Sequence, residues 1–425
     1  MSQRKNNSKN NAPKQSPLQV ILAAVLVVIA GIIYIVTGVD LTGGQLGAVP
    51  TVPPTTAAVV ATNTPRATTA PRVTATPAPV TAAPTTRPSG RLTNITLENG
   101  IGATRGFWSV YFTVPQTDRT KWQNGIDAEI AKSLADVRQT LDIAAFEWNN
   151  PALTQAVLDA HKRGVKVRMV ADNEHTIDDS GSTIKQLADA GIPIVYDNRG
   201  AFMHNKFMIL DGQSVWTGSM NFQQNDIFRN NNNVLRLNNA EVARIYTREF
   251  ETMFTDEVFG PRKAANTGTV SQSGVNIRIF FAPQNDVINP IIEEIGKAQT
   301  QIRFMTFSFT EDSLASAMLE RFRAGVSLEG VFELRGSETA ASELGLLHCA
   351  GVPVFQDGNP ATLHHKVVIV DDHTVITGSF NFSNNAIRSN DENLLIINNR
   401  DIAALYLQEY ERMKAIARTP SRVTC

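Results

Sequence analysis

Cysteine is scarce in this chain of 425 residues, which contains only Cys349 and Cys425. Two cysteines are too few for the disulfide framework of a small secreted domain, and their spacing is not that of a zinc site. The sequence therefore excludes a disulfide-dense scaffold and predicts no metal site. Whether the two cysteines pair with each other stays open.

An excess of positive charge is also missing. The chain has 39 Lys and Arg against 40 Asp and Glu. Eight of the basic residues and one acidic residue precede residue 95, which leaves a net charge of −8 on the remainder with neutral histidines. Proteins that bind nucleic acid through many phosphate contacts usually have the opposite sign. The balance argues against an extended nucleic-acid surface, although a local basic cleft remains compatible with it.

Large apolar side chains are almost absent from residues 49–90, which read VPTVPPTTAAVVATNTPRATTAPRVTATPAPVTAAPTTRPSG. Such a segment cannot bury enough apolar surface to offset the loss of chain entropy on folding. Proline-rich chains of this kind are extended and semi-rigid. We therefore predict that residues 40–94 form a disordered linker rich in Pro, Thr and Ala.

Residues 1–17 lack acidic side chains but contain four basic ones, and residues 18–39 form a long apolar stretch that includes VILAAVLVVIAGIIYIV. At about 1.5 Å per residue, roughly 20 residues span a hydrocarbon core of about 30 Å. The sequence predicts a cytoplasmic tail (1–17) and one transmembrane helix (18–39) in the cell membrane, with the remainder outside the cytoplasm. A cleaved signal peptide is the alternative, but its apolar core is usually only about 7–15 residues long.

The remainder of the chain repeats itself. The stretch MHNKFMILDGQSVWTGSMNF at 203–222 returns as LHHKVVIVDDHTVITGSFNF at 363–382, about 160 positions later. AGIPIVYD and AGVPVFQD, among other segments, repeat at the same period. This indicates a duplicated domain and not a solenoid of short repeats. We place the two halves at 95–262 and 263–425.

Each half alternates strand and helix patterns. Short apolar runs at 142–146, 165–171 and 192–196 predict buried strands, and the intervening segments 128–140, 151–163 and 182–190 predict helices. This order favours an α/β fold in which helices cover a central sheet, so that each half is an α/β/α sandwich.

Both copies of the long repeat contain the pattern H-x-K-x4-D-x6-G-S-x-N. The positions are His204, Lys206, Asp211, Ser219 and Asn221 in the first copy, and His364, Lys366, Asp371, Ser379 and Asn381 in the second. Strand alternation places each His and Lys on one face, Asp211-Gly212 predicts a two-residue hairpin turn, and the returning strand brings Ser and Asn back beside the pair. A lone H-x-K is uninformative, but six fixed positions match by chance on the order of once in 10⁷ start sites. Two matches in register indicate function.

The double motif resembles the phospholipase D superfamily of phosphodiesterases over residues 105–415. The resemblance implies two halves related by pseudo-twofold symmetry, whose His-Lys pairs meet in one site without a partner protein. It also implies hydrolysis through a phosphohistidine, with no metal or other cofactor. One histidine attacks phosphorus and the other protonates the leaving oxygen.

The residue types suit an anionic substrate. Lys206 and Lys366 would supply positive charge, and we expect Asn221, Asn381, Ser219 and Ser379 to donate hydrogen bonds to the phosphoryl oxygens. Asp211 and Asp371 are counted with the catalytic set, although an isolated aspartate there is more often a turn residue. His365 and His373 are expected to have no catalytic role, and the expected surface histidines are His161, His175 and His348.

Glu392 lies 28 residues beyond His364, whereas Asn232 occupies the equivalent place in the first half. Members of the superfamily often orient the catalytic imidazole with a carboxylate near this position. Because a carboxylate raises imidazole basicity, we predict that Glu392 supports His364 as the nucleophile and that His204 is the acid.

The membrane tether and the acidic folded part favour phospholipid head groups as substrate. A metal-independent extracellular endonuclease is the alternative, since GSMNFQ and GSFNFS look nuclease-like. Transfer to an alcohol in place of hydrolysis stays open. A catalytically silent surface-binding module is a third interpretation, which the two intact motifs argue against.

Overall fold

The computed structural model describes residues 90–116, 118 and 120–425. The predicted cytoplasmic tail, the predicted transmembrane helix and nearly all of the predicted linker lie outside these residues. Within them, no helix combines the length and apolar character needed to cross a membrane.

The first half is built on a mixed sheet, whose strands run in the order β1-β2-β3-β9-β8-β7-β4-β5-β6. Strands β4, β5 and β6 are mutually parallel, and the other pairings are antiparallel. Thr93 and Asn94, which the sequence assigned to the linker, belong to β1. The strands are β1 (Thr93–Leu97), β2 (Gly100–Arg105), β3 (Trp108–Thr113), β4 (Thr140–Ala145), β5 (Lys166–Ala171), β6 (Ile194–Tyr196), β7 (Lys206–Leu210), β8 (Ser214–Gly218) and β9 (Asn233–Leu237).

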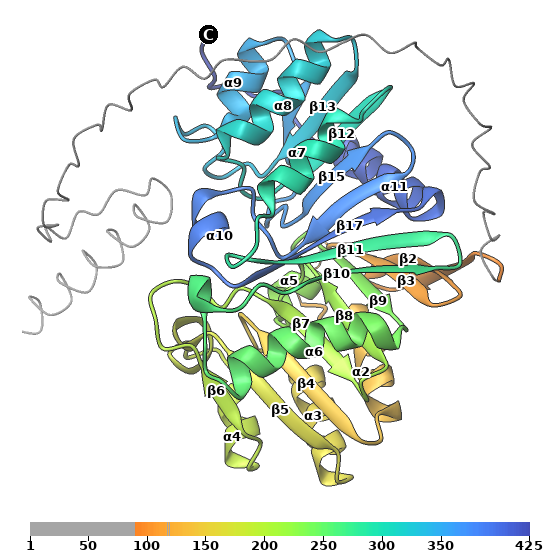
Figure 1. Cartoon of the computed structure of the whole chain (residues 1–425), viewed down its shortest axis with the longest axis vertical. Coiled ribbons are helices and arrows are strands. Elements are labelled where there is room, and N and C mark those ends of the chain that lie inside the picture. The colour runs from red at the N-terminus through yellow and green to blue at the C-terminus, as the bar shows by residue number, and fades with distance from the viewer. Residues whose placement is uncertain (1–89, 117, 119) are drawn as a thin grey trace, which may run out of the picture. The chain divides into compact units, whose positions relative to one another are not determined.

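The second half repeats this sheet without an equivalent of β1, in the order β10-β11-β17-β16-β15-β12-β13-β14. The strands are β10 (Thr267–Gln272), β11 (Val275–Ala282), β12 (Gln301–Thr306), β13 (Ser327–Phe332), β14 (Val354–Gln356), β15 (Lys366–Val370), β16 (Thr374–Gly378) and β17 (Glu392–Asn398). The shared order confirms the prediction of two duplicated α/β halves, which are stacked along the long axis of Figure 1.

Helices flank both sheets. The outer helices of the first half are α2 (Ile126–Asp136), α3 (Pro151–Lys162) and α4 (Ile184–Asp189), and those of the second are α7 (Ile288–Gly296), α8 (Asp312–Arg323) and α9 (Glu343–Cys349). The inner faces carry α6 (Ala240–Phe254) and α11 (Arg400–Ile416), and short helices α5 (Gln224–Phe228) and α10 (Asn384–Arg388) follow the motifs. The segments η1 (Asn173–Ile177) and η2 (Gly260–Arg262) complete the helical elements of the described residues. Helix α2 ends four residues before the predicted 140, because Thr140 already begins β4.

Strand alternation explains how one sheet serves two cores. Phe207 and Ile209 of β7 pack in a central core, whereas Met208 and Leu210 pack against the outer helices. The central core also contains Tyr246 of α6 and residues of α11 and β11, so it belongs to both halves. The two halves are therefore fixed against each other by shared apolar burial, which positions the sheet edges that carry the motifs.

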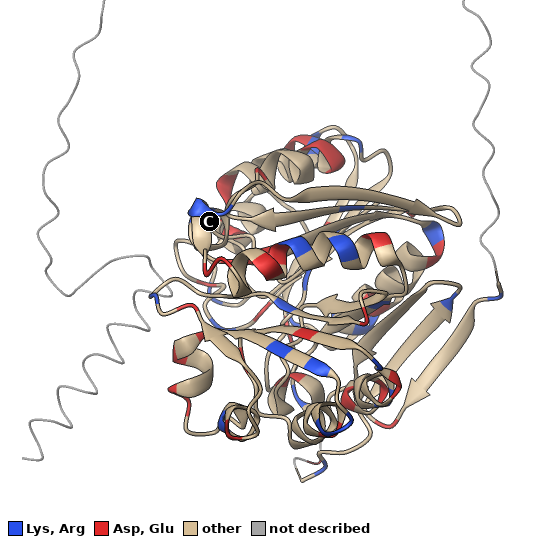
Figure 2. Ribbon diagram, turned by 60° about the horizontal axis from the view of Figure 1, so that its bottom comes forward, with Lys and Arg blue, Asp and Glu red and all other residues tan. Residues whose placement is uncertain are grey.

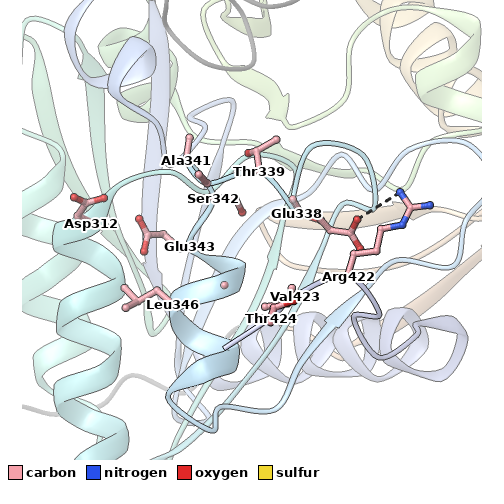
Figure 3. A pocket seen from close by; sticks show the side chains of 13 residues that line it. Asp312, Glu338, Thr339, Ala341, Ser342, Glu343, Leu346, Arg422, Val423 and Thr424 are labelled. Atoms are coloured by element: carbon pink, nitrogen blue, oxygen red, sulfur yellow. Dashed lines mark ion pairs between the residues drawn. The ribbon is translucent and has the colours of Figure 1, made fainter.

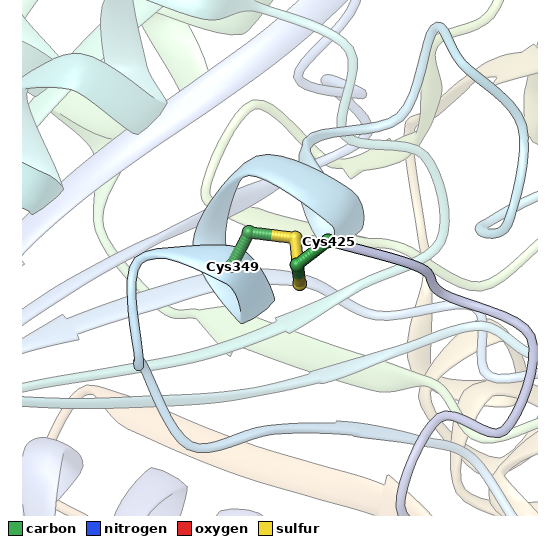
Figure 4. Close-up of a disulfide and its surroundings, with 2 residues drawn as sticks. All are labelled: Cys349 and Cys425. Carbon is green, nitrogen blue, oxygen red and sulfur yellow. A yellow bond between two sulfur atoms is a disulfide. The ribbon is translucent and has the colours of Figure 1, made fainter.

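Cys349 and Cys425 form a disulfide, with 5.4 Å between their Cα atoms, that ties the end of the chain to α9 (Figure 4). The bond closes a loop with a sequence separation of 76 residues. A crosslink of this loop length restricts the unfolded chain by about 4 kcal/mol in the chain-entropy account.

We therefore expect Cys349→Ser to lower the free energy of unfolding by up to about 4 kcal/mol, because the unfolded chain regains conformational freedom. Denaturant titration of both proteins measures the difference. An unchanged midpoint in Cys349→Ser would contradict the expectation.

Candidate active site

The two motifs lie at equivalent sheet edges. Lys206 pairs with Ala145 at the carboxyl end of β4, and Lys366 pairs with Thr306 at the carboxyl end of β12. An acidic side chain holds the backbone just before each motif histidine. The amide of Met203 donates to Asp172 (3.0 Å), and that of Leu363 donates to Glu333 (2.6 Å). These bonds fix the backbone that leads into each histidine.

Backbone pairing between the halves brings the motifs together. Met203, just before His204, forms a bridge to Asp391 of the second half, and Leu363, just before His364, forms one to Asn231 of the first. The amide of His364 also donates to the carbonyl of Asn231 (2.9 Å). Each histidine is thus seated against the opposite half.

Both His-Lys pairs are almost fully buried, with each lysine 1% exposed. Lys206 Nζ donates to the carbonyl of His204 (2.6 Å), and Lys366 Nζ donates to that of His364 (2.9 Å). Phenylalanine rings, Phe146 and Phe307 respectively, lie 4.7 and 4.8 Å from the two ammonium groups. The predicted His-Lys association is present in both halves.

The electrostatics show that the four groups share one environment. Burial and then the charge of Lys366 lower the pKa of His364 to about 4. Burial lowers the pKa of Lys206 to about 8, and burial together with the charge of Lys206 lowers the pKa of Lys366. Cations crowded in a buried site disfavour one another's charge, so a bound anion would stabilise all of them.

The imidazole of His204 is oriented by Glu392, whose carboxylate lies 2.8 Å from Nδ1. Ser379 donates to the same carboxylate oxygen (2.6 Å). Glu392 therefore belongs to the site as predicted, but its predicted partner, His364, is wrong. The start of β17 faces the histidine of the other half, a relation that the order of residues along the chain does not reveal.

The imidazole of His364 has two different partners. Its Nδ1 lies 2.9 Å from Oδ1 of Asn232 and 3.1 Å from Oδ1 of Asp226, both from the first half. Asp226 lies on α5, outside the repeated motif, so motif reasoning missed it. The available signal was the substitution pattern: where the second half has Ala386 and Glu392, the first has Asp226 and Asn232.

The serines of the motif contact the side chains that orient the histidines. Ser219 donates to Oδ1 of Asn232 (2.8 Å) and Ser379 donates to Glu392, and both are fully buried. Each hydroxyl thus holds the partner of a histidine, and the predicted contact of the serines with phosphoryl oxygens stays a prediction.

The side-chain oxygens of both motif asparagines, Asn221 and Asn381, have no hydrogen-bond partner among the described residues, but the two differ in burial. Asn221 donates to Glu147 and to Asp226 (3.3 Å), so its amide is engaged by carboxylates of its own half. Asn221 is buried, whereas Asn381 is half-buried. Their predicted contact with the phosphoryl group stays a prediction.

Asp211 and Asp371 lie at the opposite end of the motif strands from the lysines, about 16 Å away at roughly 3.3 Å per residue. Asp211 accepts hydrogen bonds from the amides of residues 138–140, and Asp371 accepts them from residues 299–301. Burial alone would raise the pKa of each carboxyl, but these amides lower it. The structure does not place them beside the lysines but has them anchor the strand entering β4 or β12, and their assignment to the catalytic set stays a prediction. The hairpin loop at Asp211-Gly212 has three residues and not two, because Leu210 pairs with Ser214.

Asp211→Ala is accordingly expected to lower the free energy of unfolding by about 2 kcal/mol, the typical cost of losing charge-assisted bonds to several amides. Activity per folded molecule should stay within about twofold of the original, because no atom of the site is touched. Chemical denaturation and a turnover assay on the same preparation measure both quantities. A large loss of turnover in a fully folded variant would support the catalytic assignment.

The remaining histidines divide into two groups. His365 is fully buried between Asn233 (3.1 Å) and Glu409 (2.9 Å), consistent with the expectation of no catalytic role, and His373 is exposed. His161, His175 and His348 are partly exposed. His175 lies 4.2 Å from the ring of Phe146 and bonds to Asp172 (2.8 Å), so it forms part of the wall beside His204.

A cleft of about 450 Å³ opens between α9 and the chain end (Figure 3). Its lining includes three carboxyl side chains, Asp312, Glu338 and Glu343, and none of the motif residues. Because the motif residues lie elsewhere, this cleft is not the candidate site. Among the described residues, no group of three or more His, Cys, Asp or Glu side chains could hold a metal ion.

A family model described as "Cardiolipin synthase, PLD-like domain" matches residues 130–254 and 291–414, which together make up more than half of the chain. The chain belongs to this phospholipase D-like family. Each matched segment contains one complete copy of the motif, so the resemblance stated from the sequence is confirmed.

Curated relatives match over a single half. A mitochondrial cardiolipin hydrolase of Homo sapiens is 36% identical over 136 residues, which is 32% of this chain and 53% of that protein. A phospholipase D of Rickettsia prowazekii is 30% identical over 135 residues, or 32% of this chain and 66% of that one. The chain therefore spans 53% and 66% of the length of these two relatives, less than two thirds of each.

Among solved structures, phosphatidylserine synthase of Haemophilus influenzae aligns over 69% of this chain and 85% of its own, with a TM-score of 0.55 and 14% identity. At this identity the likeness shows the duplicated fold alone.

Proposed function

We propose that this chain is a phospholipase D-type phosphodiester hydrolase that acts on phospholipid head groups through a covalent phosphohistidine. The observation that supports the proposal is the pair of buried imidazoles, one from each half, each with a carboxyl group at Nδ1 and a lysine beside it. Phosphoryl transfer needs a nucleophile, an acid and positive charge around the phosphoryl oxygens, and this arrangement contains all three.

The reaction divides into two displacements. In the first, Nε2 of one histidine forms a bond to phosphorus while the bond to the head-group oxygen breaks and the second histidine gives that oxygen its proton. In the second, the same second histidine removes a proton from water, the water oxygen bonds to phosphorus, and the phosphorus–nitrogen bond breaks. Lys206 and Lys366 stabilise the negative oxygens in both steps.

Exposed apolar side chains support a lipid substrate. Ile177, Phe307 and Leu334 are 55%, 38% and 44% exposed, and they follow β5, β12 and β13 at the sheet edges that carry the histidines. The ring of Phe307 lies 5.0 Å from that of His364. Exposed apolar side chains beside a charged site suit acyl chains, and Lys and Arg are interspersed with acidic residues over the fold (Figure 2).

The location is part of the same proposal. Residues 18–39 would anchor the enzyme by a single span, with residues 1–17 in the cytoplasm and the linker of residues 40–94 carrying the catalytic part outside. The disulfide supports an extracytoplasmic position, because disulfides persist in oxidising compartments and are rare in the cytosol.

The test offers the full-length chain phosphatidylcholine vesicles and a supercoiled plasmid in parallel, with EDTA in both reactions. We expect choline release that His204→Ala and His364→Ala each abolish, and an intact plasmid. Plasmid cleavage without choline release would replace this proposal with a tethered nuclease. If neither substrate reacts with the unaltered protein, the proposal is contradicted and a silent binding module would be the better account.

A further inference from the structure

The two halves place their carboxylates differently at equivalent positions. Glu392 begins β17 and Asn232 directly precedes the equivalent β9, while Ala386 of α10 corresponds to Asp226 of α5. In both halves six residues separate the helix position from the strand position. The first half thus has its carboxylate on the helix and an amide at the strand, and the second half has no carboxylate at the helix position.

The orientation of the Asn232 amide is fixed by its neighbours. Its Nδ2 donates to the carbonyl of Asp226 (3.0 Å) and to Oδ1 of Asp226 (2.8 Å), so its Oδ1 faces the hydroxyl of Ser219 and Nδ1 of His364. An amide oxygen can only accept a hydrogen bond. His364 must therefore carry its proton on Nδ1, which leaves the lone pair of Nε2 free to attack.

Asp226 also favours the form of His364 that carries its proton on Nδ1. Its Oδ1 lies 3.1 Å from Nδ1 of His364, while Oδ2 accepts from Gln223 (2.6 Å) and Asn221 (3.3 Å). The side chain is 1% exposed. Burial would raise the pKa of Asp226. The interaction with His364 and the hydrogen bonds from Asn232 and Gln223 outweigh burial and hold that pKa at about 2. An ionised carboxylate at Nδ1 makes Nε2 more basic and more nucleophilic.

The other imidazole has a different environment. Burial raises the pKa of Glu392 to about 8, so this carboxyl group is largely protonated at neutral pH. A protonated carboxyl can donate to Nδ1 of His204, which places the imidazole proton on Nε2. A histidine with its proton on Nε2 can give that proton to a leaving oxygen while its Nδ1 takes the proton of the Glu392 carboxyl group, which lies 2.8 Å away.

We propose that Asp226 is the positioning residue of His364, in the role that Glu392 has for His204. Because Asp226 is ionised and Glu392 is protonated, His364 is the nucleophile and His204 is the acid. The inference rests on the proposed function for its chemistry. Asp226 acts through His364 and Asn232 and does not touch the reacting atoms.

The second half of the chain suggests a variant that should restore the activity lost in Asp226→Ala. Asp226→Ala is expected to lower kcat on the order of 10²-fold, with KM changed by less than about threefold, because basicity and orientation are lost but charge for binding remains. The double variant Asp226→Ala/Asn232→Glu copies the second half and should return to within about tenfold of the original activity. Asp256→Asn is the matched control, since this exposed acid lies beyond α6. The substrate is bis(p-nitrophenyl) phosphate, and thermal melting checks folding.

A second measurement does not depend on turnover. In ¹⁵N-labelled full-length protein, the NMR signals of the His364 ring nitrogens are assigned by their loss in His364→Gln. These signals should show the proton on Nδ1, and Asp226→Asn should increase the form that has its proton on Nε2. Full activity in Asp226→Ala, or an Nε2-protonated His364 in the original protein, would overturn the inference. An unaltered protein that hydrolyses no phosphodiester would refute the proposed function instead, and the tautomer would still decide the role of Asp226.

Discussion

His364→Ala is expected to lower kcat on the order of 10⁴-fold or more with every phosphodiester, because it removes the atom that bonds to phosphorus. His204→Ala should lose a similar factor with phosphatidylcholine, whose choline leaving group needs a proton. With bis(p-nitrophenyl) phosphate the two variants should separate, since p-nitrophenolate leaves without protonation. His204→Ala should then form the covalent intermediate, visible as a burst of one p-nitrophenolate per site, while His364→Ala should give none.

His365→Asn is the matched control for both variants. It converts HHK of the second motif to HNK of the first, and His365 bonds to Asn233 and Glu409 on the core side of the strand. Its activity should stay within about threefold of the original. A burst in His364→Ala but not in His204→Ala would exchange the two roles, and a burst in neither would contradict covalent catalysis.

Lys206→Met is expected to lower kcat/KM by about 10²–10³-fold, the usual result of removing one group that stabilises a developing oxyanion. The charge can also be removed by titration. Because the pKa of Lys206 is lowered to about 8 by burial, proton loss from this side chain should reduce kcat/KM as the pH rises through about 8. Glu392, whose pKa burial raises to about 8, loses its proton in the same range.

The pH profile therefore has a distinctive shape. We expect log kcat/KM to rise as His364 loses its proton near pH 4. It should fall above about pH 8 with a slope of more than one proton, because Lys206 and Glu392 lose their protons there and the pKa of Lys366 is also lowered. Lys206→Arg keeps its charge at every pH used, so its alkaline slope should be smaller by about one proton. An unchanged alkaline slope in Lys206→Arg would show that the charge of Lys206 does not control this limb.

The sequence allowed the duplicated α/β architecture and the association of the His-Lys pairs to be predicted, because both depend on patterns that repeat along the chain. Strand alternation placed His204 and Lys206 on the same face of their strand. It placed His365 on the face opposite to His364 and Lys366. The partners of the imidazoles could not be predicted in the same way. Glu392 contacts His204 only because β17 starts at the junction of the halves, and that packing is set by the shared apolar core and not by distance in sequence.

The two motif aspartates show the opposite difficulty. Asp211 recurs in both copies as strictly as the histidines, yet it holds backbone amides at the far end of β7. A residue can recur in a duplicated motif because the fold needs it, and not only because the chemistry does. Asp226, by contrast, does not recur, and only a comparison of unlike positions in the two halves could have identified it.

Trapping the covalent intermediate tests the central claim most directly. The full-length chain would be mixed with phosphatidylcholine labelled with ³²P, quenched in alkali after a few turnovers, digested and mapped, with EDTA present throughout. We predict an acid-labile, alkali-stable label on the peptide that contains His364, and its accumulation in His204→Ala when the head group is p-nitrophenol. Active protein that never carries a label, or a label confined to the His204 peptide, would contradict this account.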